Sequence, residues 1–311
     1  MKSSVLFILA FLFAVVPDQN DPDKRNDLKK MELRGKVKSL KEISYEVMEK
    51  SDVIVKGKRI YPSVEYDSYY CFNQAGYVVE SKIYNITDNT IYTNQYKYNA
   101  DNQRMVRIKT GSDEGKSAKW TYSYNARGKL LSQNYYSPQD KLICKETYTY
   151  DDQEVLLRMD KKFMNGLGHS YYTYITNSLG YVKEKSQYDN NNKLEYKYLY
   201  SYDSKGNLLA ESSFMEGKEF VSKTEYKYNE AALLLSKTDY YGDGSVMSSI
   251  IYGYDQEGNL VSQIYKESGG VTYEKWKFKN KTDENGNWVQ RIQYKNDNPN
   301  HFIERIFEYY E

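Results

Sequence analysis

The stretch YKYLYSYDSKGNLLAESSFMEGKEFVS, residues 196–222, contains the pattern that decides the fold. Every second residue from Tyr196 to Tyr202 is a tyrosine, which is the period of a β-strand with its rings on one face. A polar turn follows at residues 203–207, where Gly206 is available for a positive φ. A return strand and a second glycine-containing turn complete the unit. The stretch therefore predicts a β-hairpin that leads directly into another.

The same unit recurs along most of the chain. Triplets of the form aromatic-x-aromatic begin at Tyr70, Tyr96, Tyr122, Tyr148, Tyr172, Tyr200, Tyr226, Tyr252 and Trp276. The steps between them are 26, 26, 26, 24, 28, 26, 26 and 24 residues. Because the 24 and the 28 cancel, we expect one loop to be shortened and the next to be lengthened. A fixed period of this size predicts a repeat array rather than an ordinary globule.

We therefore predict an all-β fold, a long antiparallel meander of β-hairpin repeats of about 26 residues that fills residues 35–311 with about 20 strands. Open twisted sheets rarely exceed about 10 strands, so the strip is expected to curl or coil. Its concave side should carry the tyrosines, because the opposite positions are polar. These include Lys97, Ser123, Thr149, Ser201 and Lys227.

Composition limits the function. The chain of 311 residues has 36 tyrosines against 10 phenylalanines and 3 tryptophans, so tyrosine is the main residue available to form a core. The formal net charge is +1, and the basic residues form no stripe. Nucleic-acid binding requires such a stripe, so we expect no nucleic-acid partner.

The first residues resemble a secretory signal. Lys2 precedes an apolar run from Val5 to Val16, which is shorter than the roughly 20 residues that span a bilayer. We predict a signal peptide at residues 1–17, a polar linker at 18–34 and export to the periplasm, the outer surface or the medium. No cysteine follows the run, so a lipoprotein is not expected. An uncleaved membrane anchor is the alternative, and it is the one membrane association that we expect.

The chain has two cysteines, Cys71 and Cys144. An exported chain with two cysteines invites a disulfide. In the predicted strip, however, six strands separate them by roughly 29 Å at 4.8 Å per strand, and a disulfide needs Cα atoms within about 7 Å. We therefore predict two free thiols.

Other polar motifs are better explained as turns than as sites. His169 and His301 lie in turn-like segments without a nucleophile or carboxylate placed beside them. Asp283, Asn285 and Asn287 resemble a calcium loop, but the sixth and twelfth positions lack the glycine and glutamate that an EF-hand needs. We predict no metal, no cofactor, no catalytic residue and no enzymatic activity.

The tyrosines are the one feature that could bind a ligand. The candidate stacking residues are Tyr122, Tyr148, Tyr172, Tyr200, Tyr226 and Tyr252. We favour a structural role for them, because cross-strand aromatic pairs stabilise a sheet and something must form the core. A concave surface on which the rings stack on sugars or hold a peptide is the functional alternative.

Three copies of the unit carry a family resemblance: YSYDSKGNLL (200–209), YGYDQEGNLV (252–261) and YSYNARGKLL (122–131). They resemble the YD repeat of the RHS family over roughly residues 66–311. That resemblance implies a long antiparallel β-strip that coils, and in large members the strip encloses a toxin domain. This chain shows no appended toxin domain, and looks most like the short secreted YD-repeat proteins of Gram-negative bacteria.

These observations predict an exported, non-enzymatic repeat protein that binds a carbohydrate or a protein at the cell envelope or outside it. The alternative is a structural shell or spacer, or an RHS-like encapsulating fragment; an enzyme ranks third. The strands at 35–47 and 305–311 should cap the edges of the sheet, or pair with another copy to form an oligomer. The ligand and the closure of the strip stay open at this point.

Overall fold

A computed structural model describes residues 26–311, with the exception of residues 52, 61–66, 86, 113–116, 165 and 167. The predicted signal peptide therefore lies outside the described residues. One short helix precedes the strands, α1 (Asp27–Lys30), and a 3-10 turn, η2 (Ser268–Gly270), separates two of them. The strands are β1 (Val37–Lys50), β2 (Val53–Arg59), β3 (Asp67–Phe72), β4 (Val78–Tyr84), β5 (Thr90–Tyr98), β6 (Arg104–Gly111), β7 (Ala118–Tyr124), β8 (Leu130–Tyr136), β9 (Leu142–Tyr150), β10 (Leu156–Phe163), β11 (His169–Thr176), β12 (Val182–Tyr188), β13 (Leu194–Tyr202), β14 (Leu208–Met215), β15 (Glu219–Tyr228), β16 (Leu234–Tyr241), β17 (Val246–Tyr254), β18 (Leu260–Glu267), β19 (Thr272–Thr282), β20 (Trp288–Lys295) and β21 (Asn298–Tyr309).

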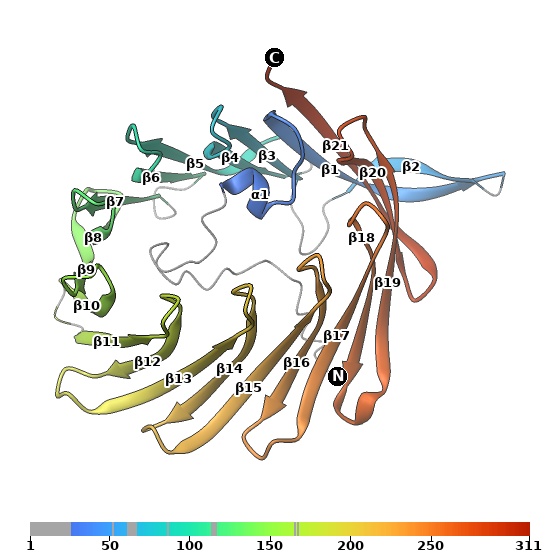
Figure 1. The fold of residues 1–311 in the computed structure, drawn as a ribbon. Coiled ribbons are helices and arrows are strands. Elements are labelled where there is room, and N and C mark those ends of the chain that lie inside the picture. The colour runs from blue at the N-terminus through green and yellow to red at the C-terminus, as the bar shows by residue number, and fades with distance from the viewer. Residues whose placement is uncertain are drawn as a thin grey trace.

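The strands form one antiparallel sheet that closes on itself (Figure 1). From β3 to β21 each strand pairs with the next, and β1 joins the ends by pairing with β3 through residues 39–42 and with β21 through residues 37–46. Twenty strands thus form the ring, while β2 pairs with the end of β1 alone and projects from it. The predicted meander of hairpin repeats is confirmed, and the expected curling of the strip is completed as a barrel.

At one end of the barrel, the side chain of the first residue builds each of nine described hairpin turns. Asp203 Oδ1 accepts hydrogen bonds from the backbone N–H of Lys205 at 2.9 Å and of Asn207 at 2.8 Å, and Gly206 has a φ of 88°. This arrangement is an Asx turn, which Asp and Asn favour because the side chain replaces a backbone acceptor. The equivalent side-chain acceptors in other turns are Asn73, Asn99, Asn125, Asp151, Asn177, Asn229, Asp255 and Asp283.

The turns keep a more regular spacing than the aromatic triplets. The positive-φ residue of the turn is Gly76, Asn102, Gly128, Glu154, Gly180, Gly206, Ala232, Gly258 and Gly286. The steps are 26 residues throughout, except for the last, which is 28. The prediction that one loop is shortened and the next lengthened around Tyr172 is therefore wrong. The triplet shifts because Thr176 occupies the last strand position, where the neighbouring repeats have a tyrosine.

Inward-facing side chains line the wall of the barrel but do not pack into one continuous core. Two local clusters of buried apolar residues occur in the described part of the chain, one around α1 and β1, the other on β8–β12. Most inner tyrosines elsewhere stay partly exposed. This is expected from strand number, since about 8 strands leave room only for side chains, whereas 16–18 leave an aqueous channel.

The segment before β1 lies inside the ring (Figure 1). It contacts turns on both sides of the seam, the place where β1 joins β3 and β21 and closes the sheet. At one end Leu28 donates its N–H to the Gly76 carbonyl at 3.0 Å, and Asp27 accepts from the Val78 N–H at 2.8 Å. At the other end the Arg34 side chain donates to the backbone carbonyls of Glu257 and Gly286. The segment thereby joins three turns at one end of the barrel.

Candidate binding lumen

The tyrosine face of the sheet is the inner face of the barrel. Leu28 of α1, which lies inside the ring, packs in one cluster with Leu40 and Phe72, and Tyr70 and Tyr96 pack against that cluster. Side chains two residues apart share a face, so the alternating tyrosines in register with Tyr70 and Tyr96 point inward with these two. The predicted tyrosine-lined concave side is thus the wall of a lumen.

All six candidate stacking tyrosines lie on this wall. Tyr148 and Tyr252 are the most buried, at 5% and 8% exposure, and the other four are partly exposed. Their cross-strand neighbours are mostly polar: Tyr122 lies opposite Gln133, Tyr148 opposite Met159, Tyr172 opposite Gln187, Tyr200 opposite Glu211, Tyr226 opposite Lys237 and Tyr252 opposite Gln263.

Tyr172 differs in position from the other five. It lies one inward-facing pair further from the Asx turn, so that the true equivalent of Tyr200 and Tyr226 in its repeat is Tyr174. Tyr174 lies opposite Lys185, is 5% exposed and packs in the buried cluster that includes Tyr148. The triplet spacing misassigned this residue, because the aromatic pattern shifts while the turn does not.

A second set of tyrosines forms hydrogen bonds to the backbone of the barrel wall. The last tyrosine of a strand donates its hydroxyl to the backbone carbonyl 20 residues earlier, at 2.7 to 3.0 Å. The donors are Tyr98, Tyr124, Tyr150, Tyr202 and Tyr254. Each bond satisfies a carbonyl beside the bulge that follows the turn. The alternation of tyrosines in the sequence did not distinguish this set from the stacking set.

Burial keeps the stacking tyrosines protonated. It raises the pKa of Tyr226 to about 12, and raises the pKa of Tyr148, Tyr200 and Tyr252 above the usual value of 10.0 as well. A neutral phenol presents both an apolar ring and a hydroxyl donor. The lumen wall therefore combines stacking surfaces with hydrogen-bonding groups at neutral pH.

Charged side chains also face the lumen, and many of them are neutralised in pairs. These pairs are Lys161–Glu146 at 3.1 Å, Lys237–Asp239 at 3.1 Å, Lys295–Glu274 at 2.8 Å and Arg305–Glu42 at 2.7 Å. Lys185 lies between the rings of Tyr172 and Tyr198, at 4.8 and 5.1 Å from their centroids, and burial lowers its pKa. The sequence reasoning did not identify these inward charges, although they stand at alternate positions opposite the tyrosines.

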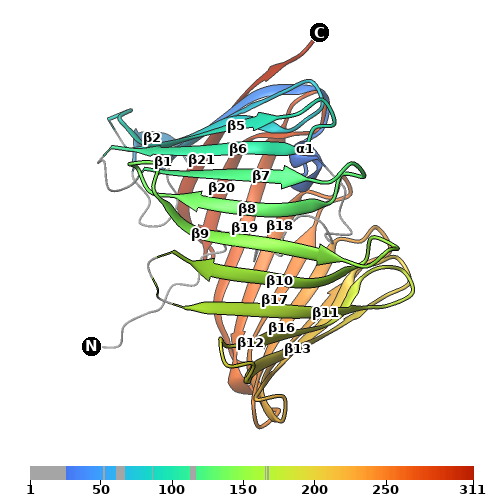
Figure 2. The same cartoon turned by 90° about the vertical axis from the view of Figure 1, so that its left-hand side faces the viewer.

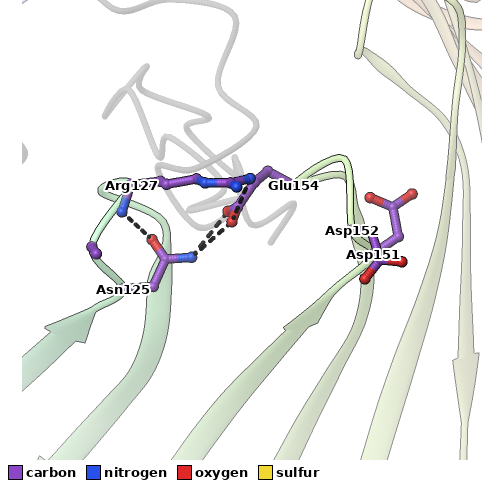
Figure 3. Close-up of a pocket in the computed structure, with 6 residues that line it drawn as sticks. Asn125, Arg127, Asp151, Asp152 and Glu154 are labelled. Carbon is purple, nitrogen blue, oxygen red and sulfur yellow. Dashed lines mark hydrogen bonds and ion pairs between the residues drawn. The ribbon is translucent and has the colours of Figure 1, made fainter.

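A hollow of about 520 Å³ lies between two Asx turns at the rim (Figure 3). Its polar groups are already engaged: Asn125 Nδ2 donates to Glu154 Oε2 at 3.0 Å, and Arg127 pairs with Glu154 at 3.5 Å. Asp151 accepts the N–H of Val155 at 2.8 Å. The hollow is thus a contact between turns, in which Glu154 holds its unfavourable φ of 65° through these partners.

The histidines and cysteines are separated from one another in space. His169 lies beside Asp160 at 3.0 Å on the outer face, whereas His301 faces the lumen and burial lowers its pKa. Cys71 lies on the outer face and Cys144 on the inner face, and both are free thiols. Among the residues that the structure describes, no group of three His, Cys, Asp or Glu side chains could hold a metal ion. No described helix is long and apolar enough to cross a membrane.

Comparisons with known proteins give fold-level likeness only. No family model matches the chain, and no curated protein matches it. A porin-like protein from Bacteroides uniformis matches over 88% of this chain and 98% of its own, at 10% identity and a TM-score of 0.39. A porin-like protein from Bacteroides vulgatus matches over 88% and 99%, at 11% identity and a TM-score of 0.28. The TcdB2–TccC3 structure matches at 11% identity and a TM-score of 0.25, and this chain covers 84% of itself and 19% of that chain.

Proposed function

We propose that this protein is an exported, non-enzymatic binding protein whose lumen holds an extended glycan. The observation that carries the proposal is the inner wall, where the partly exposed rings of Tyr122, Tyr172, Tyr200 and Tyr226 stand opposite amide or charged side chains. Ligand sites combine apolar walls with a few polar groups in this way. The repeat offers the same combination at successive positions around the barrel, which suits a ligand that is itself a chain of similar units.

A glycan matches this wall better than an apolar ligand does. A sugar ring has a C–H face that packs on an aromatic ring and hydroxyl groups that bond to amides and phenols. Gln133, Gln187 and Gln263 each stand beside an inner tyrosine in the pairing register. The two kinds of contact thus recur together.

The outer face of β19 supports contact with water rather than with lipid. The outward positions of β19 are Lys275, Lys277, Lys279 and Lys281, all exposed. A lysine on the lipid face of a barrel costs about 2–4 kcal/mol at the bilayer midplane. A row of four on one strand therefore favours water at the outer face of β19.

A structural shell is the second candidate. The observation that favours it is the repeated hydroxyl-to-carbonyl bond, which uses five tyrosines to hold the wall rather than to bind. In that case the hollow ring would act as a spacer or container, and its inner rings would have no ligand of their own.

Binding of the purified full chain to a glycan array tests the proposal. For a bound glycan, Tyr226→Ala should weaken the affinity about fivefold, since one aromatic contact is worth about 1 kcal/mol. Tyr226→Phe keeps the ring and should bind nearly as the parent does. Tyr240→Ala changes a tyrosine on the outer face and is the matched control. If no glycan binds, the result favours the structural shell over glycan binding. The same holds if Tyr226→Ala and a second inner change, Tyr200→Ala, both leave the affinity unchanged.

A further inference from the structure

Strand β6 places three basic side chains on the lumen wall. Arg107 and Lys109 face inward because they pair with Tyr96 and Asn94 of β5. Arg104 faces inward too, since the register shifts by one residue between the pairs Lys97–Val106 and Tyr98–Arg104. A bulge of this kind changes the alternation of a strand. It therefore adds a third basic side chain to the same face, in one row with the other two.

Aromatic rings surround the row. The Arg104 guanidinium lies 4.8 Å from the Tyr96 ring centroid, and the Arg107 guanidinium lies 4.5 Å from that of Trp120. Lys109 Nζ lies 4.4 Å above the Tyr92 ring. Figure 2 shows the strands concerned, β5 to β8, as neighbours on one wall of the barrel. We call this the cationic wall, and its basic members are Arg104, Arg107 and Lys109.

The cationic wall has no carboxylate of its own. Within the described residues of β5–β8, the inward positions of the paired register are aromatic, aliphatic, amide, basic or small, and none of the three basic residues makes an ion pair there. Asp27 of α1 contributes a favourable charge to Arg104 but accepts a hydrogen bond from the Val78 N–H. Several basic residues elsewhere in the lumen, such as Lys161 and Lys295, are paired with glutamates.

The guanidinium groups also keep unused hydrogen-bonding capacity. Among the residues that the structure describes, Arg104 Nε is buried without an acceptor, although a buried donor normally has one. Arg107 directs both Nε and Nη2 to a single oxygen, Asn94 Oδ1, at 3.2 and 3.0 Å. A guanidinium has five N–H donors in a planar fork that fits a carboxylate. Within the described residues, Arg107 and Lys109 therefore lack a carboxylate partner, and Arg104 keeps one N–H donor without an acceptor.

We infer that the cationic wall is a binding site for a carboxylate-bearing glycan, such as a chain of uronic acid units. The carboxylates lie against Arg104, Arg107 and Lys109, while sugar rings pack on Trp120 and Tyr122 of the adjacent strand β7. This inference rests on the proposed glycan-binding function and names the class of glycan that the lumen selects.

Calorimetric titration of the full chain with a galacturonate hexamer tests the inference. The control ligand is the same hexamer with its carboxyl groups reduced to alcohols, which keeps the sugar and removes the charge. The acidic hexamer should bind at least tenfold more tightly, since charge-assisted hydrogen bonds exceed neutral ones in strength. Its affinity should also fall as salt is raised, because ions screen the attraction. Both readouts use the unaltered protein and do not depend on the folding of a variant.

Variants then locate the site. Arg107→Gln and Lys109→Gln should each weaken binding of the acidic hexamer about tenfold and leave binding of the reduced hexamer unchanged. Lys97→Gln removes an exposed charge from the outer face of β5 and should change neither. Loss of affinity for both hexamers in Arg107→Gln, with Lys97→Gln unaffected, would contradict a site selective for charge.

The outcomes separate this inference from the proposed function. Equal affinity for the two hexamers would overturn the cationic wall as a selective site and leave glycan binding in the lumen standing. If neither hexamer binds and the glycan array is also blank, both proposals fail. If polyglutamate binds as tightly as the acidic hexamer, the wall recognises carboxylates without a sugar, and the glycan assignment is wrong.

Discussion

Arg34 and Asn287 exchange two hydrogen bonds of 2.8 Å each, although 253 residues separate them in the chain. The Arg34 N–H donates to Asn287 Oδ1, and Asn287 Nδ2 donates to the Arg34 carbonyl. Asn287 is 4% exposed, so both bonds are made away from water. They connect the segment before the first strand to the turn between β19 and β20, next to the seam at which the barrel closes.

Removal of this side chain should weaken the seam. Asn287→Ala leaves the Arg34 N–H and carbonyl without partners, and we expect a loss of about 2 kcal/mol in the free energy of unfolding. Urea denaturation followed by circular dichroism measures it. Asn259→Ala is the matched control, because Asn259 occupies the same turn position and its side chain bonds only within its own turn, to Asp255. An equal loss in both variants would show that the turn, rather than the seam, carries the effect.

The hydroxyl-to-carbonyl bond should contribute measurably to stability. Tyr202→Phe removes the donor to the Val182 carbonyl and should cost about 1 kcal/mol, since the carbonyl loses its side-chain partner. Tyr228 occupies the same register position one repeat later but makes no such bond. Tyr228→Phe should therefore change the free energy of unfolding by much less. Equal effects of the two variants in thermal denaturation would contradict the role assigned to the bond.

One turn contains a residue in an unfavourable backbone conformation. Ala232 has a φ of 62° at the position that most other turns fill with glycine. A non-glycine residue at positive φ costs roughly 1–2 kcal/mol, and glycine removes that strain. Glycine also loses more backbone entropy on folding than alanine does, which offsets part of the stabilisation. Ala232→Gly should thus raise the stability by about 0.5–1 kcal/mol, seen as a higher melting temperature.

The reverse change in another turn provides the comparison. At Gly206, with a φ of 88°, an added Cβ would lie 2.3 Å from the Tyr181 hydroxyl. Gly206→Ala should therefore lower the melting temperature. If both substitutions move it in the same direction, backbone strain does not determine the choice of residue in these turns.

His301 should make stability depend on pH. Burial lowers its pKa below the usual 6.5, so the unfolded chain binds a proton more readily than the folded protein does. The contribution of neutral His301 to the free energy of unfolding is therefore complete above about pH 6.5. It is lost as the pH falls through that value toward the pKa of the folded state. Urea denaturation at several pH values should show this loss, and His301→Gln should reduce it. An unchanged pH dependence in His301→Gln would rule out the assignment.

The sequence was sufficient for the local structure. The alternation from Tyr196 to Tyr202 and the turn around Gly206 predict a hairpin from backbone preferences and side-chain period alone, and the polar positions between the tyrosines indicate which face is turned inward. The inward direction of the six candidate tyrosines follows from the same two facts, although the equivalence of Tyr172 with the other five does not. Each depends on residues within one repeat.

Closure and the cationic wall depend on relations between repeats. The pairing of β1 with β21 joins the two ends of the array, and no local pattern gives its register. The inward direction of Arg104 depends on a bulge, which moves a residue to the other face without altering composition. Thr176 shows the same limit, since its substitution for a tyrosine shifted the aromatic spacing and left the turns in place.

The seam also determines which pairing closes the sheet. Every other strand of the ring can pair with a strand made shortly before it, but β1 is made first and must wait for β21, the last. Until then the growing sheet has an open edge, and open edges recruit other chains. A chain that lacks β21 would form a sheet with unpaired strands at both ends, β1 at one and β20 at the other. Strand β21 thus decides whether the sheet closes on itself or keeps two edges at which another chain can pair.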